Sequence, residues 1–335
     1  MKGRGGSGQT GADKENMQFK WPVIEVGTKG WTAVDAGPGG TLVGVSVRNS
    51  TRTGARPQVL KCARSAKGDA GAEALTELAR KVGVIGFPWT LPLRRSDYKM
   101  LVIAEPPVAA SEMELSLRWT LGSMIDFPID EANVAWMRIP TADLLAGRAK
   151  HIYAIVSRRE VVEGRAAMFH KAKLNLRAVD VRETAQRNVA ALLEKKGEGL
   201  GLLSLGPHGV TITFTFGGEL YLDRFIEQSL DEIVAADEAG REKIFERIAL
   251  QLSRSVDFIS RSFPFMAVER LVLAPLPAPM GLFDYLVQNL AMKVEMLDLA
   301  SVFDLSLVPD LRAPENQSIY FFALGAALRG RGAGS

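Results

Sequence analysis

Hydrophobic and polar positions follow two similar series along the chain, and each series opens with short segments rich in β-branched residues. In the first half the pattern predicts strands at 23–25, 42–47, 59–64 and 99–104, with a turn-rich segment at 35–40. The spacing of Leu75, Leu78 and Val82 predicts a helix over 72–82. After residue 199 the series starts again, with strands predicted at 200–205, 211–216 and 219–225. The repeated three-strand meander predicts an α/β fold with two similar lobes.

A smaller helix–strand–strand–helix pattern interrupts the first half. Ser111 and Glu114 have the spacing of a capping box at the start of a helix over 111–124. Strands at 133–139 and 152–156 and a helix at 159–171 complete this segment, which is short enough to be an inserted α+β subdomain. Further helices are predicted at 180–193, 240–263, 281–290 and 319–329, with strands at 268–273 and 294–297. The predicted organisation is a lead at 1–20, lobe 1 at 21–106 with 178–198 and 318–330, the subdomain at 107–177, and lobe 2 at 199–317.

The composition narrows the functional classes. The 335 residues are 47% hydrophobic and 24% charged, as in ordinary globular proteins, and the net charge of +3 comes with no basic face interleaved with aromatic residues. Nucleic acid is therefore not an expected partner. One cysteine, Cys62, excludes an internal disulfide, and no histidine has metal-ligand spacing with it, so no metal site is expected.

The chain has no segment that predicts a membrane span or a signal peptide. No apolar run reaches the roughly 18 residues of a transmembrane helix. The first 20 residues are rich in glycine and charge, without an apolar core, and predict a disordered lead. The expected location is the cytoplasm, with any membrane association provided by a partner.

One segment has a specific sequence, EMELSLRWTLGSMIDFPIDE at 112–131, and the segments 152–163, 185–193, 202–213, 248–258 and 324–329 follow it. In this order they resemble the PilM family of type IV pilus assembly proteins, most closely its MshI type from mannose-sensitive haemagglutinin (MSHA) pili. PilM-like proteins are actin-like and related to FtsA. The resemblance implies a two-lobed actin-like ATPase fold, which is a duplicated RNase H-like fold, with a small inserted subdomain.

The resemblance also implies a nucleotide site between two hairpins, and three of its motifs are altered. Aspartate is expected where the first hairpin, read at 43–50, has Ser46, with Arg48 at a glycine position and Ser50 nearby; in the second hairpin Ser204 replaces aspartate. The second hairpin keeps Gly206, Gly209 and Thr211, with His208 at its tip, either as a phosphate contact or as a solvated turn residue. The segment 273–281 has three prolines in place of a glycine triplet. We therefore expect no enzyme activity and no cofactor, and ATP binding without turnover remains the alternative.

The partner implied by the resemblance is an inner-membrane PilN/MshJ-like protein, bound through its cytoplasmic N-terminal tail, and in addition the pilus assembly ATPase. The residues expected to line that site are Leu117, Arg118, Trp119, Phe127 and Pro128. The alternatives are that Trp119 is a core residue and that Phe127-Pro128 is a rigid turn. The first functional hypothesis is a scaffold at the inner face of the inner membrane, the second a nucleotide-binding switch. The third is a type II secretion module, disfavoured because such chains continue into a membrane span.

Overall fold

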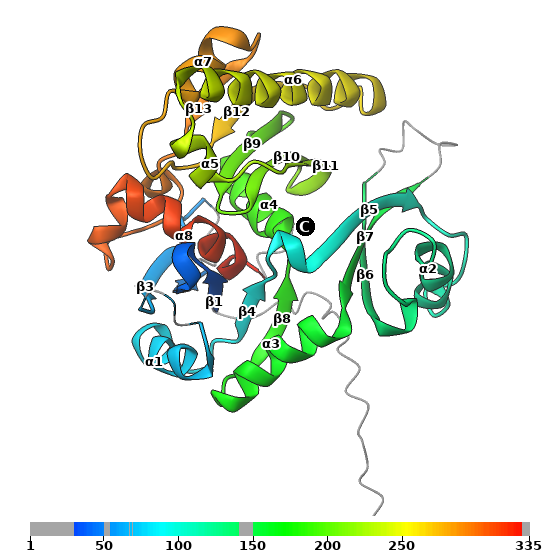
Figure 1. The fold of residues 1–335 in the computed structure, drawn as a ribbon, viewed down its shortest axis with the longest axis vertical. Coiled ribbons are helices and arrows are strands. Elements are labelled where there is room, and N and C mark those ends of the chain that lie inside the picture. Colours follow the sequence, from blue (N-terminus) through cyan, green and yellow to red (C-terminus); the bar gives the residue numbers. More distant parts are fainter. Residues whose placement is uncertain (1–29, 50–53, 67, 69, 141–149, 330–335) are drawn as a thin grey trace, which may run out of the picture.

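The computed structural model describes residues 30–49, 54–66, 68, 70–140 and 150–329, which form two lobes with the same sheet topology (Figure 1). In lobe 1 the strand order is β3-β2-β1-β4-β8, and in lobe 2 it is β11-β10-β9-β12-β13. In both sheets the first three strands in the order are antiparallel and the last three are parallel. The predicted two-lobed, duplicated α/β fold is confirmed by this repeat. The strands of lobe 1 are β1 Gly30–Ala36, β2 Leu42–Arg48, β3 Gln58–Arg64, β4 Trp89–Pro92 and β8 Leu176–Asp180; those of lobe 2 are β9 Gly199–Gly206, β10 Gly209–Phe216, β11 Glu219–Ile226, β12 Val268–Leu273 and β13 Lys293–Met296.

Two helices, α4 Arg182–Leu193 and α8 Pro314–Ala327, share one hydrophobic core with both sheets. Valines of β2 and leucines of β9 belong to the same cluster as the buried residues of α8, so this core joins the two lobes. The two helices cross in backbone contact, because a Cβ atom on Gly325 would lie 2.2 Å from the carbonyl oxygen of Ala185. Asn188 of α4 donates to the carbonyl of Gly325 at 3.0 Å and fixes this crossing.

The outer helices cover the remaining faces of the sheets. In lobe 1, α1 Ala72–Val82 packs on β2 at Gly44, where a Cβ atom would lie 3.0 Å from the side chain of Val82. In lobe 2, the long helix α6 Glu238–Ser262 lies along the outer edge (Figure 1, top), buried through Phe245, Ile248, Leu252 and Ile259. The other helices of lobe 2 are α5 Leu230–Ala235 and α7 Leu282–Asn289.

The inserted subdomain is a three-stranded antiparallel sheet covered by one helix. Its strands are β5 Tyr98–Ala104, β6 Ala132–Arg138 and β7 His151–Arg158, in the order β5-β7-β6, and its helix is α2 Met113–Leu121. One face of the sheet packs against α2, and the other belongs to the core that continues into lobes 1 and 2. The helix α3 Arg159–Lys171 follows β7 and contacts both this sheet and lobe 1.

The structure departs from the sequence expectations at several elements. Strands β1, β4 and β8 were not expected, and the strand expected at 23–25 lies outside the described residues. Strand β5 belongs to the subdomain sheet, although the expected boundary was residue 107, and β8 belongs to lobe 1. Ser111 is not the N-cap of α2, which begins at Met113 without a side-chain cap; a capping box is formed instead by Ser229 with Glu232, at α5.

Candidate functional site

The first glycine hairpin lies between β1 and β2, one strand earlier than the sequence indicated. β1 ends in Asp35-Ala36, and the turn at 37–41 closes with a hydrogen bond of 2.9 Å from the Gly37 amide to the Thr41 carbonyl. Gly39 and Gly40 have φ angles of +64° and +72°, where side chains with a Cβ are strained. The strand-end aspartate of this hairpin is therefore Asp35.

Ser46 and Arg48 are not at the tip of this hairpin. Ser46 is buried in the middle of β2, opposite Thr32 of β1, and its hydroxyl lies 2.7 Å from the Thr32 hydroxyl. It donates to the carbonyl of Val82 at the end of α1 at 2.5 Å. Arg48 is exposed at the far end of β2, and Ser50 lies outside the described residues. Ser46 thus joins β2 to α1 rather than standing at a strand–turn junction.

The second hairpin, between β9 and β10, has the position that the sequence indicated. Gly206 pairs with Gly209 across a two-residue turn of Pro207 and His208. Gly209 leaves no space for a side chain, because a Cβ atom would lie 2.5 Å from the carbonyl oxygen of Ile226. This close packing explains the glycine without invoking a ligand.

Ser204 is bound to helix α4 through Gln186. The Ser204 hydroxyl donates to Oε1 of Gln186 at 2.6 Å. Nε2 of Gln186 donates to the Leu202 carbonyl at 2.7 Å and to the Thr213 hydroxyl at 3.0 Å, and lies 3.3 Å from the carbonyl of Thr211. All five residues are buried, so this neutral network takes the place of a carboxylate at the base of the hairpin.

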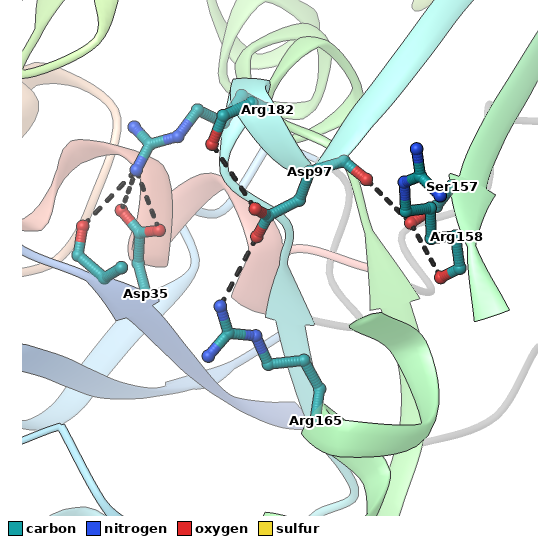
Figure 2. Close-up of polar contacts among 8 residues, drawn as sticks. Asp35, Asp97, Ser157, Arg158, Arg165 and Arg182 are labelled. Atoms are coloured by element: carbon teal, nitrogen blue, oxygen red, sulfur yellow. Dashed lines mark hydrogen bonds and ion pairs between the residues drawn. The ribbon is translucent and has the colours of Figure 1, made fainter. Parts of the chain in front are cut away.

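Arg182, the first residue of α4, lies between the two hairpins. Its Nη2 contacts both carboxylate oxygens of Asp35 at 3.1 Å and lies 3.4 Å from the Ala36 carbonyl (Figure 2). A Cβ atom on Gly206 would lie 3.9 Å from its Nη1, so the same guanidinium also approaches the second hairpin. Its carbon Cζ lies 4.3 Å from the centre of the Phe322 ring of α8. The chain therefore places its own cation between the two glycine turns.

The electrostatics of this position are dominated by burial and by cations. Burial raises the pKa of Asp35, and the charges of Arg182 and Arg94 oppose that rise. At the second hairpin, burial lowers the pKa of His208, and Arg182 and Arg94 lower it further. Asp35 is the one carboxylate in contact with Arg182 among the described residues, and both side chains are 5% exposed.

A second polar group joins the subdomain to lobe 1 beside this position. Asp97 accepts from Arg165 of α3 at 3.4 Å through its carboxylate, and its carbonyl accepts from the Ser157 hydroxyl at 2.7 Å (Figure 2). Ser157 is the penultimate residue of β7, and Asp97 immediately precedes β5. These bonds fix the start of the subdomain sheet relative to α3.

Glu183, the residue after Arg182, is buried and lies close to a second carboxyl group, that of Asp223. The Tyr98 hydroxyl donates to the Glu183 carboxylate, and Nε of Arg95 lies 3.3 Å from it. Asp223 of β11 is close enough for the charge of Glu183 to act on it; burial and Glu183 raise the pKa of Asp223 to about 6. Burial, then Asp223, raise the pKa of Tyr153 of β7. Lobe 1, lobe 2 and the subdomain thus meet around the buried carboxyl group of Glu183 and the partly buried one of Asp223.

The third expected motif, the strand–helix turn after β12, is filled by apolar side chains. Residues 274–281 connect β12 to α7, and Ala274, Leu276 and Met280 are buried. Prolines at 275, 277 and 279 supply no amide hydrogen, which leaves few backbone donors for a nucleotide. Gly281 has a φ of +84° and begins the helix.

These residues do not fit a magnesium nucleotide. Asp35, the carboxylate at the base of the first hairpin, is neutralised by Arg182, and the second hairpin has a serine bound to Gln186. Mg²⁺ prefers free carboxylate and phosphate oxygens, and the guanidinium of Arg182 beside Asp35 repels it. Within the described part of the chain, no group of three or more His, Cys, Asp or Glu residues could hold a metal ion.

The residues expected to bind a partner are divided between the core and the surface. Leu117 is fully buried against the subdomain sheet and cannot contact a partner. Arg118 donates to the carbonyls of Ile129 and Ala132, at 2.8 and 3.2 Å. Trp119 is 81% exposed, and therefore is not a core residue.

The Phe127-Pro128 segment joins the subdomain to the start of α3. Phe127 is partly buried under the guanidinium of Arg158, 4.3 Å from its ring centre, and Pro128 is exposed. Arg159 donates to the Asp130 carbonyl at 2.7 Å. These contacts give the segment a structural role, so Trp119 and Pro128 are the exposed residues of the expected set.

Four residues of the site were missed from the sequence: Asp35, Arg182, Gln186 and Asp223. Asp35 had a local signal, because it ends an apolar segment and precedes a glycine-rich turn. Arg182 is 147 residues from Asp35, and no local pattern connects them.

Comparison with known proteins identifies structures with a similar fold. No family model matches the chain, and no curated protein sequence matches it. Among solved structures, the chain is similar to one from the "PilM-PilN type IV pilus biogenesis complex", with a TM-score of 0.69 and 19% identity over 90% of this chain and 98% of that one. Similarity to the cytoplasmic domain of EpsL, an inner-membrane component of the type II secretion system of Vibrio cholerae, is weaker, with a TM-score of 0.46 and 12% identity over 74% and 84%. A Bacteroides thetaiotaomicron protein with an actin-like ATPase fold gives a TM-score of 0.47 and 8% identity over 84% and 94%. The chain therefore has the PilM-like, actin-like fold.

Proposed function

We propose that this protein is a scaffold of a pilus or secretion assembly platform that works without hydrolysing ATP. The observation that carries the proposal is the Arg182–Asp35 pair, which occupies the space between the hairpins with the chain's own charge. An actin-like fold without a free metal-binding carboxylate at that position retains its two-lobed shape. It lacks the carboxylate that would hold a metal ion to stabilise the charge of a transferred phosphoryl group. What remains is a surface for binding other proteins.

The shared fold supports the choice of platform. The similar structure comes from the "PilM-PilN type IV pilus biogenesis complex", and the similarity covers 98% of the matched chain. We propose by analogy that this protein binds the cytoplasmic tail of a PilN/MshJ-like inner-membrane protein, at the inner face of that membrane, in an MSHA-like pilus system. No helix within the described residues is long and apolar enough to cross a membrane. In this proposal the pilus assembly ATPase is a further partner.

A deletion and complementation experiment tests the proposal. We expect deletion of the gene to abolish surface pili or secretion, and the wild-type chain to restore them. An Asp35→Asn, Arg182→Met double variant, which removes the charged pair and keeps its approximate volume, is expected to complement as well as the wild type. Normal piliation and secretion in the deletion strain would refute the platform role.

A second function, nucleotide binding without metal, is supported by two unpaired guanidinium nitrogens. Nε of Arg94 and Nε of Arg182 are buried and have no hydrogen-bond acceptor among the described residues. Together with the glycine turns, these cations offer donors to a phosphate in the absence of Mg²⁺. Calorimetric titration with ATP in EDTA separates this switch from the scaffold, because only the switch predicts saturable heat that disappears in an Arg94→Met variant.

A further inference from the structure

Helices α4 and α8 form the junction between the two lobes (Figure 1). Helix α8 packs on the lobe 1 strands β1, β2 and β4, and α4 packs on the lobe 2 strands β9, β10 and β11. A rotation of one lobe against the other therefore moves α4 relative to α8. Gly325, Ala185 and Val189 meet at the crossing of the two helices, and packed helices with short side chains can slide past each other. Whether these helices slide depends on the polar bonds that hold α4 on either side.

Polar side chains bind α4 to lobe 2. Gln186, which is buried, donates to the Leu202 carbonyl of β9 at 2.7 Å and to the Thr213 hydroxyl of β10 at 3.0 Å. It also accepts from the Ser204 hydroxyl at 2.6 Å. At the end of the helix, the carboxylate of Glu194 accepts from the amide in the turn between β10 and β11 at 2.7 Å. Buried polar groups are costly to separate from their partners, so we expect α4 to move with lobe 2.

The first turn of α4 is bound to lobe 1 and to the subdomain. Arg182 contacts both carboxylate oxygens of Asp35 of β1 at 3.1 Å. Glu183 accepts from the hydroxyl of Tyr98, the first residue of β5. In the middle of the helix, Asn188 donates to a carbonyl of α8 at 3.0 Å. Arg182, Asp35, Glu183 and Tyr98 are all buried, so movement of α4 relative to lobe 1 would leave charged groups without their partners.

A second connection joins the lobes at the edge strand β3. Leu297, the residue after β13, donates to the carbonyl of the last residue of β12 at 2.8 Å, so the chain still belongs to lobe 2 there. Asp304 then pairs with β3 of lobe 1: its amide donates to the Pro57 carbonyl at 2.9 Å, and its carbonyl accepts from the Val59 amide at 3.0 Å. Its carboxylate also accepts from Nε2 of Gln58 at 2.9 Å. The lobes are therefore connected at two separate positions, and a rotation about one of them would strain the other.

We infer that helix α4 performs the bridging role of a cleft ligand and fixes the angle between the two lobes, whether or not a nucleotide is added. A ligand that contacts both hairpins would link lobe 1 to lobe 2, and here Arg182 and Gln186 of one helix already contact the first and the second hairpin. A ligand shifts a conformational equilibrium only by the difference in its affinity for the two states. The inference rests on the proposed function, since it takes the position between the hairpins to be occupied by Arg182. It adds that opening and closing of the lobes is not a step at which the platform is regulated.

Distances between spin labels in the two lobes, measured on the full chain by pulsed electron paramagnetic resonance, test the inference. The background variant carries Cys62→Ser, which removes the one cysteine of the chain, with labels at Arg80→Cys and Glu246→Cys, exposed positions of α1 and α6. We expect one narrow distribution of distances, unchanged by ATP with Mg²⁺ and by ATP in EDTA. Adding Gln186→Leu and Ser204→Ala removes the network that binds α4 to β9, and is expected to broaden the distribution or add a second distance.

The matched control is Arg187→Met, which removes an ion pair of the same helix near the surface and is expected to leave the distribution unchanged. A second population above about 10% in the background variant without ligand overturns the inference, because the lobes then move freely. A shift in distance on addition of ATP overturns it too, and so does an unchanged distribution in the Gln186→Leu, Ser204→Ala variant, whose folding circular dichroism checks. The background variant alone can refute the inference even if that variant does not fold. Normal piliation in the deletion strain is a separate result, which refutes the platform role whatever the distances are.

Discussion

Replacing Arg182 by methionine is expected to destabilise the protein strongly, although it removes no apolar contact. The side chains of Arg182 and Asp35 are both 5% exposed, and two contacts of 3.1 Å join them. Removing one partner of such a pair leaves a buried, uncompensated charge, which costs about 3–5 kcal/mol of unfolding free energy. Methionine fills most of the space of the arginine stem, so this loss comes chiefly from the carboxylate.

The effect has a defined pH dependence. Burial raises the pKa of Asp35, and Arg182 opposes that rise, so the pKa increases further in Arg182→Met. A carboxyl group whose folded pKa exceeds the unfolded value is most stabilising at low pH, and stability is lost as the pH rises through the folded pKa. The variant is therefore expected to be closest to the wild type near pH 4 and furthest from it above neutral pH.

Urea unfolding of four proteins measures the effect: wild type, Arg182→Met, Asp35→Asn and the double variant. The double variant is expected to recover most of the loss, because no charge remains buried. Arg187→Met, on the same helix, is the matched control; Arg187 is bound to Glu219 at 3.6 Å near the surface, so its loss is expected to cost under about 1 kcal/mol. A cost for Arg182→Met no larger than this control, or no recovery in the double variant, would refute a buried charge pair.

Three further predictions concern the core, the acidic cluster and the subdomain. Gly325→Ala is expected to lower the unfolding free energy by about 3 kcal/mol or more, because its Cβ would lie 2.2 Å from the Ala185 carbonyl; a smaller change in urea unfolding would contradict the tight helix crossing. Asp223, with a pKa raised to about 6, is expected to reduce stability by about 2 kcal/mol as the pH rises from 4 to 7, and Asp223→Asn is expected to remove that slope; an unchanged slope in pH-dependent unfolding argues against it. Leu117→Ala is expected to cost about 2–5 kcal/mol and Trp119→Ser almost nothing, so equal melting temperatures of the two variants would contradict the burial of Leu117 and the exposure of Trp119.

The fold could be predicted from the sequence because its strands and helices carry local periodicity. The helices over 72–82 and 159–171 and the strand over 268–273 match α1, α3 and β12 residue for residue. β1 was missed because it is buried on both faces and lacks alternation, and its penultimate residue, Asp35, was therefore taken for a turn residue. That one omission displaced the first hairpin by a strand and assigned its aspartate position to Ser46.

The site depends on contacts that sequence spacing does not encode. Arg182 meets Asp35 only because α4 begins where the two sheets face each other, and Gln186 meets Ser204 one turn further along the same helix. The position of the second hairpin could be predicted, since Gly206 and Gly209 mark its turn, and Ser204 lies in its first strand as expected. For Trp119 the sequence left two interpretations open, a partner site or the core, and its exposed fraction of 81% excludes the core.

Calorimetric titration of the wild-type chain with Mg²⁺ and ATP tests the central claim most directly. With Arg182 between the hairpins and Ser204 bound to Gln186, we predict no saturable heat and no Kd below about 1 mM, with or without the tail of a membrane partner. Micromolar binding that requires Mg²⁺ and is abolished by Asp35→Asn would show that the metal displaces Arg182, and would contradict the account.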